Sequence, residues 1–107
     1  MSAEPTTTTT EYAHIVCTPG IVSGEPRIAD TRIRVRDIVL ARDNQAATPE
    51  EIVATIYPQL SLAQVYAALA YYEDHRTEVD ALQQSENDYL DAVRKSPPPY
   101  MDVREGK

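Results

Sequence analysis

The sequence predicts a small, mainly α-helical domain that contains a helix-turn-helix, with short N-terminal β segments and a long C-terminal helix. Between Thr48 and Tyr72, two segments begin with helix-capping residues, continue with apolar side chains at helical spacing, and are separated by a short connection. No proline or glycine occurs between Ser61 and Ser96, so helical structure can extend far along the chain. A chain of 107 residues is long enough for one hydrophobic core and too short for two.

The composition indicates a soluble protein of a reducing compartment. Cys17 is the single cysteine, which excludes an intrachain disulfide and favours the cytoplasm. We expect no secretion signal, because the first residues lack a basic start and an apolar stretch. No segment approaches the roughly 20 apolar residues of a membrane-spanning helix, so no membrane association is expected. The net charge is −7.

Charge is distributed unequally between the two halves of the chain. Residues 1–47 carry five arginines against six acids, whereas residues 48–107 carry five basic residues against eleven acids. The stretch from Arg27 to Arg42 is locally basic, and the stretch from Glu73 to Asp91 is strongly acidic. The basic stretch could bind phosphates, and the acidic stretch indicates a partner with a basic surface.

The N-terminal third is expected to contain a tail and short β segments. Residues 1–10, with their run of threonines, offer too little apolar surface to offset the entropy of ordering, which predicts a disordered tail. A β-prone run from Ala13 to Thr18 ends at the turn dipeptide Pro19-Gly20. From Ile28 to Arg36, arginines alternate with apolar residues, and this period of two predicts a strand with an exposed arginine face.

Two helices are expected in the middle of the chain. Asp37 can cap a short helix that ends near residues 43–44. Thr48 is a strong start for the next helix, because Pro49 occupies its first position and Glu51 completes a capping box. Pro58 ends that helix by disfavouring helical geometry at the preceding residue.

A third helix is predicted from Ser61 onward. Its apolar residues follow spacings of three and four: Leu62, Val65, Tyr66, Leu69 and Tyr72. It is expected to run on or to restart near Thr77, and an extended tail begins at Pro97-Pro98-Pro99. The predicted division is a disordered tail over 1–10, a helix-turn-helix domain over 11–83, and an acidic helical extension with a proline-rich tail over 84–107.

An ordered combination of short motifs resembles the domain of unknown function 433 family, over roughly His14 to Leu82. The motifs are Pro19-Gly20, Gly24-x-Pro26-x-Ile28, Thr31-Arg32-Ile33-x-Val35, Pro49-Glu50-Glu51-Ile52, Tyr57-Pro58-x-Leu60 and Ala67-Ala68-Leu69-Ala70-Tyr71-Tyr72. Two positions depart from the family pattern, since Ser23 and Asp30 stand where the family usually has glycine. Aspartate can hold a turn with positive φ, though less freely than glycine.

The resemblance implies N-terminal β segments and a homeodomain-like, winged-helix-like helical part. It also implies similarity to VapB-like antitoxins, which are encoded beside a PIN-like ribonuclease toxin. Neither implication comes from periodicity or composition.

The predicted DNA-binding residues lie in the helix-turn-helix and on the arginine face. Residues at the start of the third helix would face the major groove, where glutamine can pair with adenine. Arginines of the exposed strand face would contact phosphates. The predicted residues are Arg32, Arg34, Arg36, Gln59, Ser61 and Gln64. The alternatives are an αα-hairpin that serves only packing, and an arginine face that is solvated or pairs with the acidic helix of a dimer mate.

The predicted partner-binding residues lie on the apolar side of the long helical region. They are Tyr71, Tyr72, His75, Val79, Leu82 and Tyr89. Such a stripe can lie in a groove on the toxin, and the equally plausible alternative is that it forms the seam of a homodimer.

The sequence offers nothing that resembles an active site. His14 and His75 are far apart and lack further ligands at metal-binding spacing, so no metal site and no cofactor is expected. Cys17 is interpreted as a buried, inert thiol. With only three glycines there is no phosphate-binding loop, and no serine nucleophile signature occurs.

The favoured functional hypothesis is therefore a non-enzymatic antitoxin that also represses its own operator. A homodimer would bind operator DNA through its helix-turn-helix, and the acidic helix would occupy the basic RNA-binding cleft of a PIN-like nuclease toxin. The alternative is a homodimeric protein-interaction or assembly module that does not meet nucleic acid, in agreement with the overall acidity.

Overall fold

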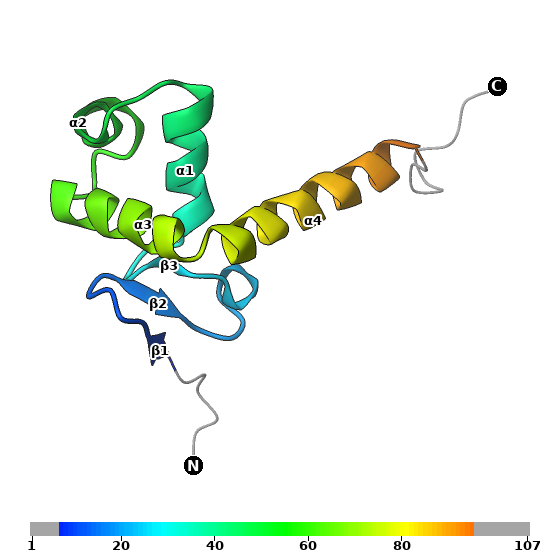
Figure 1. The fold of residues 1–107 in the computed structure, drawn as a ribbon, viewed down its shortest axis with the longest axis horizontal. Helices are drawn as coiled ribbons and strands as arrows, with labels where there is room; N and C mark the ends of the chain where they lie inside the picture. Colours follow the sequence, from blue (N-terminus) through cyan, green and yellow to red (C-terminus); the bar gives the residue numbers. More distant parts are fainter. Residues whose placement is uncertain (1–6, 96–107) are drawn as a thin grey trace, which may run out of the picture. The chain divides into compact units, whose positions relative to one another are not determined.

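The structure is a computed structural model that describes residues 7–95 (Figure 1). It divides into two compact units, with the division between Arg76 and Thr77. The predicted domain end lay at residue 83, seven residues later. The predicted proline-rich tail lies outside the described residues. The prediction of a mainly α fold with short N-terminal strands is confirmed.

The first unit begins with a small antiparallel sheet in the order β1-β2-β3. The strands are β1 (Thr8–Thr9), β2 (Ile15–Cys17) and β3 (Arg27–Ile28). Thr8 pairs with Cys17, and Ile15 pairs with Ile28. The predicted disordered tail over 1–10 is therefore wrong for Thr8 and Thr9, because β2 supplies backbone partners that composition alone does not reveal. Residues 1–6 lie outside the described part.

The predicted strand over residues 28–36 is wrong. β3 ends at Ile28, a turn follows with φ +65° at Asp30, and only an isolated bridge between Arg34 and Arg27 continues the pairing. Helix α1 (Val35–Asn44) then begins three residues earlier than expected. Its N-cap is Arg34, and the Asp37 carboxylate accepts a hydrogen bond from the Arg34 backbone N–H at 2.9 Å, as the acidic member of the cap rather than the cap itself.

The next two helices start as the sequence predicts. Helix α2 (Pro49–Glu51) has Thr48 as its N-cap, with the reciprocal bonds of a capping box at 2.8 and 3.1 Å. It continues into a π-helical turn, η2 (Ile52–Ile56), which ends at Tyr57 before Pro58. Helix α3 (Leu62–Asp74) starts at the cap Ser61.

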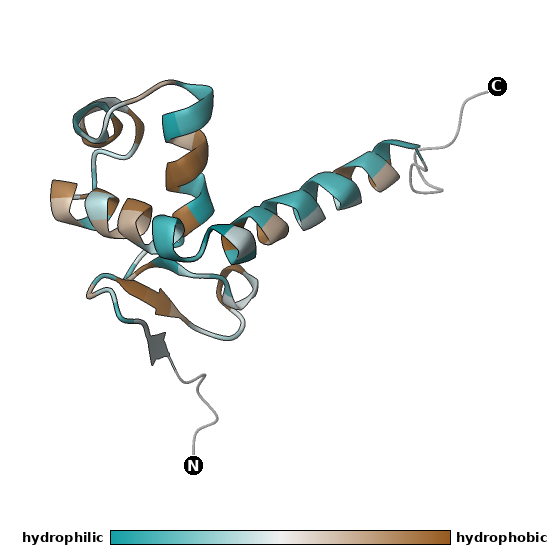
Figure 2. Cartoon of the chain, in the orientation of Figure 1, coloured by the Kyte–Doolittle hydropathy of each residue, from teal (hydrophilic) through white to brown (hydrophobic). Residues whose placement is uncertain are grey.

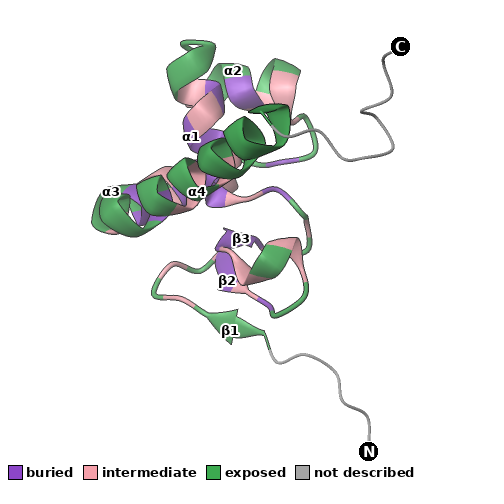
Figure 3. Cartoon of the chain, turned by 90° about the vertical axis from the view of Figure 1, so that its right-hand side faces the viewer, coloured by how far each residue is buried: buried purple, intermediate pink, exposed green. Residues whose placement is uncertain are grey.

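Apolar side chains of the sheet and of all three helices form one core in the first unit (Figures 2 and 3). Helix α3 packs against α1, α2 and the strands β2 and β3. The largest fully buried side chains of this unit are Ile15, Ile28, Val35, Ile38, Ile52 and Val65. Helices α1, α2 with η2, and α3 thus form a three-helix group in which α2 and α3 are joined by the short turn of a helix-turn-helix.

The second unit consists of helix α4, which begins at the end of the first unit and spans Arg76–Lys95. A break at His75 separates it from α3, so the helix restarts, within one residue of the predicted Thr77. Figure 3 shows α4 almost wholly in the colour of exposed residues. Among the described residues, no helix is both long and apolar enough to cross a membrane.

Candidate nucleic-acid interface and partner-binding helix

Three residues predicted to contact DNA bases lie in the connection before α3 and at the start of α3. Gln59 is exposed in the turn, and Ser61 is exposed at the cap. Gln64 is half-buried, and its side-chain oxygen accepts a hydrogen bond from the Ser61 backbone N–H at 2.8 Å, while the Ser61 hydroxyl accepts one from the Gln64 N–H at 3.2 Å. Gln64 therefore completes a second capping box, and its oxygen is engaged within the helix start.

The outer face of α3 is apolar rather than polar. Leu62, Tyr66 and Ala70 recur every fourth residue and are exposed, with 40% of Leu62 and 51% of Tyr66 accessible. The Tyr66 hydroxyl donates to the Glu50 carboxylate at 3.2 Å, and that negative charge raises the pKa of Tyr66 above its usual value. Leu62 and Tyr66 are two of the apolar positions that predict the third helix, and apolar residues on both sides of α3 are the sequence feature that indicates a second, exposed apolar face.

Basic charge is absent from the helix-turn-helix itself. No lysine or arginine occurs between Asp43 and His75, whereas Glu50 and Glu51 lie in the first turn of α2. Phosphates of DNA are bound mainly by lysine and arginine. Positively charged side chains that bind DNA phosphates beside the helix-turn-helix must therefore come from another part of the chain or from a second molecule.

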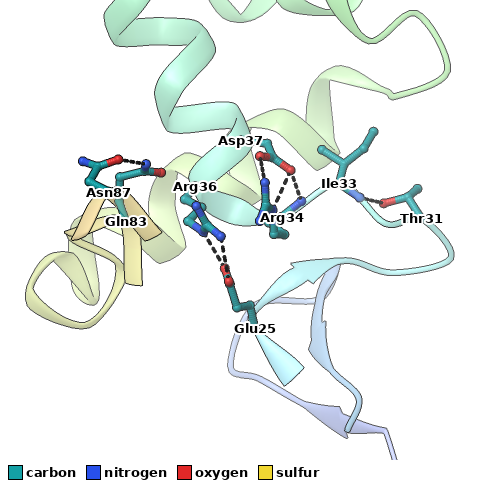
Figure 4. A network of polar contacts seen from close by, with 8 residues as sticks. All are labelled: Glu25, Thr31, Ile33, Arg34, Arg36, Asp37, Gln83 and Asn87. Carbon is teal, nitrogen blue, oxygen red and sulfur yellow. Dashed lines mark hydrogen bonds and ion pairs between the residues drawn. The ribbon is translucent and has the colours of Figure 1, made fainter. Parts of the chain in front are cut away.

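The predicted arginine face does not form. Arg36 is buried, and its guanidinium donates to both carboxylate oxygens of Glu25, at 2.7 and 2.9 Å (Figure 4). Arg34 donates to both oxygens of Asp37, at 3.1 and 2.8 Å, and this carboxylate raises the pKa of the Arg34 guanidinium. Arg32 alone of the three is exposed, because a turn and a helix start replace the expected strand.

The C-terminal end of α3 holds two aromatic residues predicted to bind a partner. Tyr71 and Tyr72 are each only 4% exposed, so both belong to the core of the first unit. The guanidinium of Arg76 lies over the Tyr72 ring, 5.1 Å from its centre. These two tyrosines contribute packing, and neither offers a surface to a partner in this fold.

His75, at the break after α3, contacts Glu11 of the N-terminal segment. Its Nε2 lies 2.8 Å from a carboxylate oxygen of Glu11, and its ring stacks on Tyr71 with centres 4.1 Å apart. The hydrogen bond from His75 lowers the pKa of Glu11. Beside it, the Tyr12 hydroxyl donates to Asp74, which raises the pKa of Tyr12 to about 12. These contacts could not be predicted from local sequence patterns, because more than 60 residues separate the partners.

Helix α4 carries an apolar stripe at spacings of three and four. Leu82 is half-buried, while Tyr89, Leu90 and Val93 are 68%, 41% and 37% exposed. Val79, by contrast, is 2% exposed, which removes it from the residues that a partner could contact. Of the six predicted partner-binding residues, Leu82 and Tyr89 thus lie on the stripe, and Leu90 and Val93 extend it.

The rest of α4 is polar and acidic. From Thr77 to Val93 there are five acids and no basic residue: Glu78, Asp80, Glu86, Asp88 and Asp91. Side-chain hydrogen bonds one helical turn apart, from Gln83 to Asn87 at 3.0 Å and from Gln84 to Asp88 at 2.9 Å, support the helix away from the stripe. The combination of apolar stripe and acidic surface suits a partner with a basic rim.

The described residues contain no group of three or more histidines, cysteines or acids able to hold a metal ion. Cys17, expected to be buried, is half-buried in β2.

Comparisons with known proteins identify relatives of this chain. The family model described as "Protein of unknown function (DUF433)" matches residues 15–72, more than half of the chain. The crystal structure of a DUF433 member protein from Anabaena variabilis ATCC 29413 is similar, with 38% sequence identity and a TM-score of 0.57. The match covers 64% of this chain and 65% of that protein. No curated protein matches the chain.

Proposed function

The chain belongs to the DUF433 family, and we propose that it is the antitoxin of a bacterial type II toxin–antitoxin pair, which neutralises a PIN-like ribonuclease in the cytoplasm. The observation that carries this proposal is the exposed apolar stripe of α4 on an otherwise acidic helix. A nuclease must bind RNA phosphates and therefore has a basic cleft. Helix α4 would lie along that cleft and exclude RNA by occupying it, without catalysis.

The three exposed side chains Tyr89, Leu90 and Val93 supply the apolar contact of this proposal. Aromatic residues buried at the centre of an interface contribute much of its binding energy, and Tyr89 has the largest exposed fraction of them. The acids around the stripe would pair with arginines or lysines at the rim of the cleft and would speed association. A helix that lies in a groove is a common mode of protein recognition.

Co-expression tests this neutralisation directly. The proposal predicts that a PIN-like ribonuclease is encoded beside this gene, that its expression stops bacterial growth, and that the full chain restores growth. The double variant Tyr89→Ser, Val93→Ser should lose the rescue, with affinity for the purified nuclease weakened on the order of 30-fold or more. The matched control Gln84→Ser, Asn87→Ser alters two uncharged residues off the stripe and should rescue fully. Equal rescue by both variants would exclude the stripe as the docking surface.

We further propose that a homodimer binds its own operator, with α3 at the major groove. The helix-turn-helix arrangement of α2 and α3 supports this, and a dimer would present two such helices to two half-sites. Gln59, Ser61 and Arg32 are the exposed residues available for DNA contact. Anisotropy titrations against promoter DNA at low and moderate salt should show specific, salt-sensitive binding, and Arg32→Gln should reduce the salt slope by about one.

A second candidate is a protein-interaction module whose helix-turn-helix does not bind DNA. The lack of any lysine or arginine between Asp43 and His75 favours it, as does the apolar outer face of α3 with Leu62 and Tyr66. Absence of promoter binding at low salt, together with a folded dimer, would establish this candidate over the autorepressor.

A further inference from the structure

An open cavity lies in the first unit, between the segment that follows β2 and the turn that follows β3. It has a volume of about 440 Å³, and its lining residues are Ile21, Arg27, Asp30, Thr31 and Arg32. The cavity is shallow and open to solvent, so it suits a small ligand that binds mainly through charge and hydrogen bonds. Two of its five lining residues are arginines, in a protein whose net charge is −7.

Arg27 is the buried cation of this cavity. Its side chain donates to the Thr31 carbonyl oxygen at 3.0 Å and to the Thr18 hydroxyl at 2.8 Å, and the residue is only 7% exposed. A guanidinium has five N–H donors, and both acceptors here are neutral. Its Nε is fully buried and has no hydrogen-bond partner. A buried charge that meets only neutral groups is costly, and an anion would compensate it.

Arg32 supplies a second, exposed cation, and the turn that carries it is well defined. Asp30 adopts φ +65°, and the Thr31 hydroxyl donates to the Ile28 carbonyl oxygen at 2.8 Å while it accepts from the Ile33 N–H at 3.0 Å. These bonds fix the backbone on both sides of Arg32. The backbone position from which the Arg32 side chain reaches the cavity is thereby set before any ligand arrives, which limits the backbone entropy lost on binding.

We propose that this cavity binds a phosphate dianion, either free phosphate or the phosphate group of a small phosphorylated molecule. Guanidinium groups bind phosphate oxygens through paired hydrogen bonds, and Arg27 and Arg32 would provide two positive charges in the lining of the cavity. The Ile21 side chain offers an apolar wall for an organic substituent. Asp30 lines the same cavity and reduces the affinity for an anion. This site is independent of the proposed antitoxin activity, because it uses no residue of α4.

Titration of the full-length, isotope-labelled protein with inorganic phosphate, followed by NMR at constant ionic strength, tests the proposal. We expect saturable shifts of the Thr31 and Arg32 amide signals and of the Arg27 Nε–H signal. Arg32→Gln should weaken phosphate binding about fivefold to tenfold, as expected for a charged hydrogen bond in a partly exposed site. Asp30→Asn should strengthen it, and it preserves the fold because asparagine tolerates positive φ.

The matched control Arg94→Gln removes the same charge from α4, outside the lining of the cavity, and should leave phosphate binding unchanged. Linear, unsaturable shifts, or equal affinities in all three variants, would overturn the proposal. A phosphate monoester should compete with inorganic phosphate for the same signals. Shifts that are produced by a DNA duplex and not by phosphate or a monoester would also overturn it, because the anion would then be a nucleic-acid phosphodiester.

Discussion

The ion pair between Arg36 and Glu25 fastens the segment before β3 to the first turn of α1, and its loss should destabilise the first unit. The two side chains are 6% and 11% exposed, and the guanidinium contacts both carboxylate oxygens. Glu25→Gln keeps the shape and one acceptor oxygen but removes the negative charge that pairs with the buried arginine. Breaking a buried pair in this way costs about 3 kcal/mol, a large share of the roughly 5–15 kcal/mol that stabilises a domain.

Urea unfolding measures this loss. The protein has no tryptophan, so the tyrosine signal is the natural probe, and the first unit contains Tyr12, Tyr57, Tyr66, Tyr71 and Tyr72. With a denaturant dependence of about 1.5 kcal/mol per molar urea, a loss of about 3 kcal/mol lowers the midpoint by about 2 M. An unfolding curve followed by tyrosine reports on the packed unit rather than on the helicity of α4.

The control is Glu73→Gln, the same chemical change in an exposed pair. Glu73 lies 3.1 Å from Arg76 and 3.7 Å from Arg42, and its own side chain is more than half exposed, so the loss of its charge should cost no more than about 1 kcal/mol. Arg36→Met completes a double-mutant cycle with Glu25→Gln and should give a coupling energy of about 2 kcal/mol. If Glu25→Gln and Glu73→Gln cost the same, the buried pair does not stabilise this unit and the reasoning fails.

Three further predictions concern protonation and capping. Glu11 should titrate below 4.5, and His75→Phe, which keeps the aromatic stack and removes the hydrogen bond, should return its pKa toward that value. Because the pKa of Glu11 is depressed in the folded state, the contact should be fully stabilising above about pH 4.5 and should weaken as the pH falls through the lowered pKa; carboxyl NMR signals measured against pH report both effects. Tyr12 should ionise with a pKa of about 12, and Asp74→Asn should lower it toward 10 in an absorbance titration of tyrosinate. Thr48→Ala should cost about 1 kcal/mol in urea unfolding, whereas Thr48→Ser should cost little; equal losses in the two variants would exclude the capping box as the cause.

The starts of α2 and α3 were predictable because they depend on neighbouring residues. Thr48, Pro49 and Glu51 form their cap within four positions, and Ser61 begins α3 as expected. The end of α1 and the restart after His75 also follow from local pattern. In the two capping boxes the sequence places donor and acceptor a fixed distance apart, so tertiary context has little to change.

The arginine positions were not predictable, because distant partners decide them. The alternation from Ile28 to Arg36 fits a strand, but the apolar spacing of Val35, Ile38 and Val39 fits a helix equally well, and the core selects the helix. Burial of Arg36 depends on Glu25, eleven residues earlier, and the position of His75 depends on Glu11. No periodicity within a single segment encodes such pairs.

These contacts also determine which charged side chains remain available to bind DNA or a protein partner. Arg34 and Arg36 are engaged by acids within the first unit, and Arg27 donates to neutral oxygens beside a cavity. The helix-turn-helix therefore lacks the phosphate contacts that the sequence alone suggests, and Arg32 remains as the exposed cation of that stretch. The acids from Thr77 to Val93 have no basic residue among them. A basic partner on α4 would neutralise charge that otherwise repels DNA, so recognition of a partner and recognition of DNA by this chain would reinforce each other.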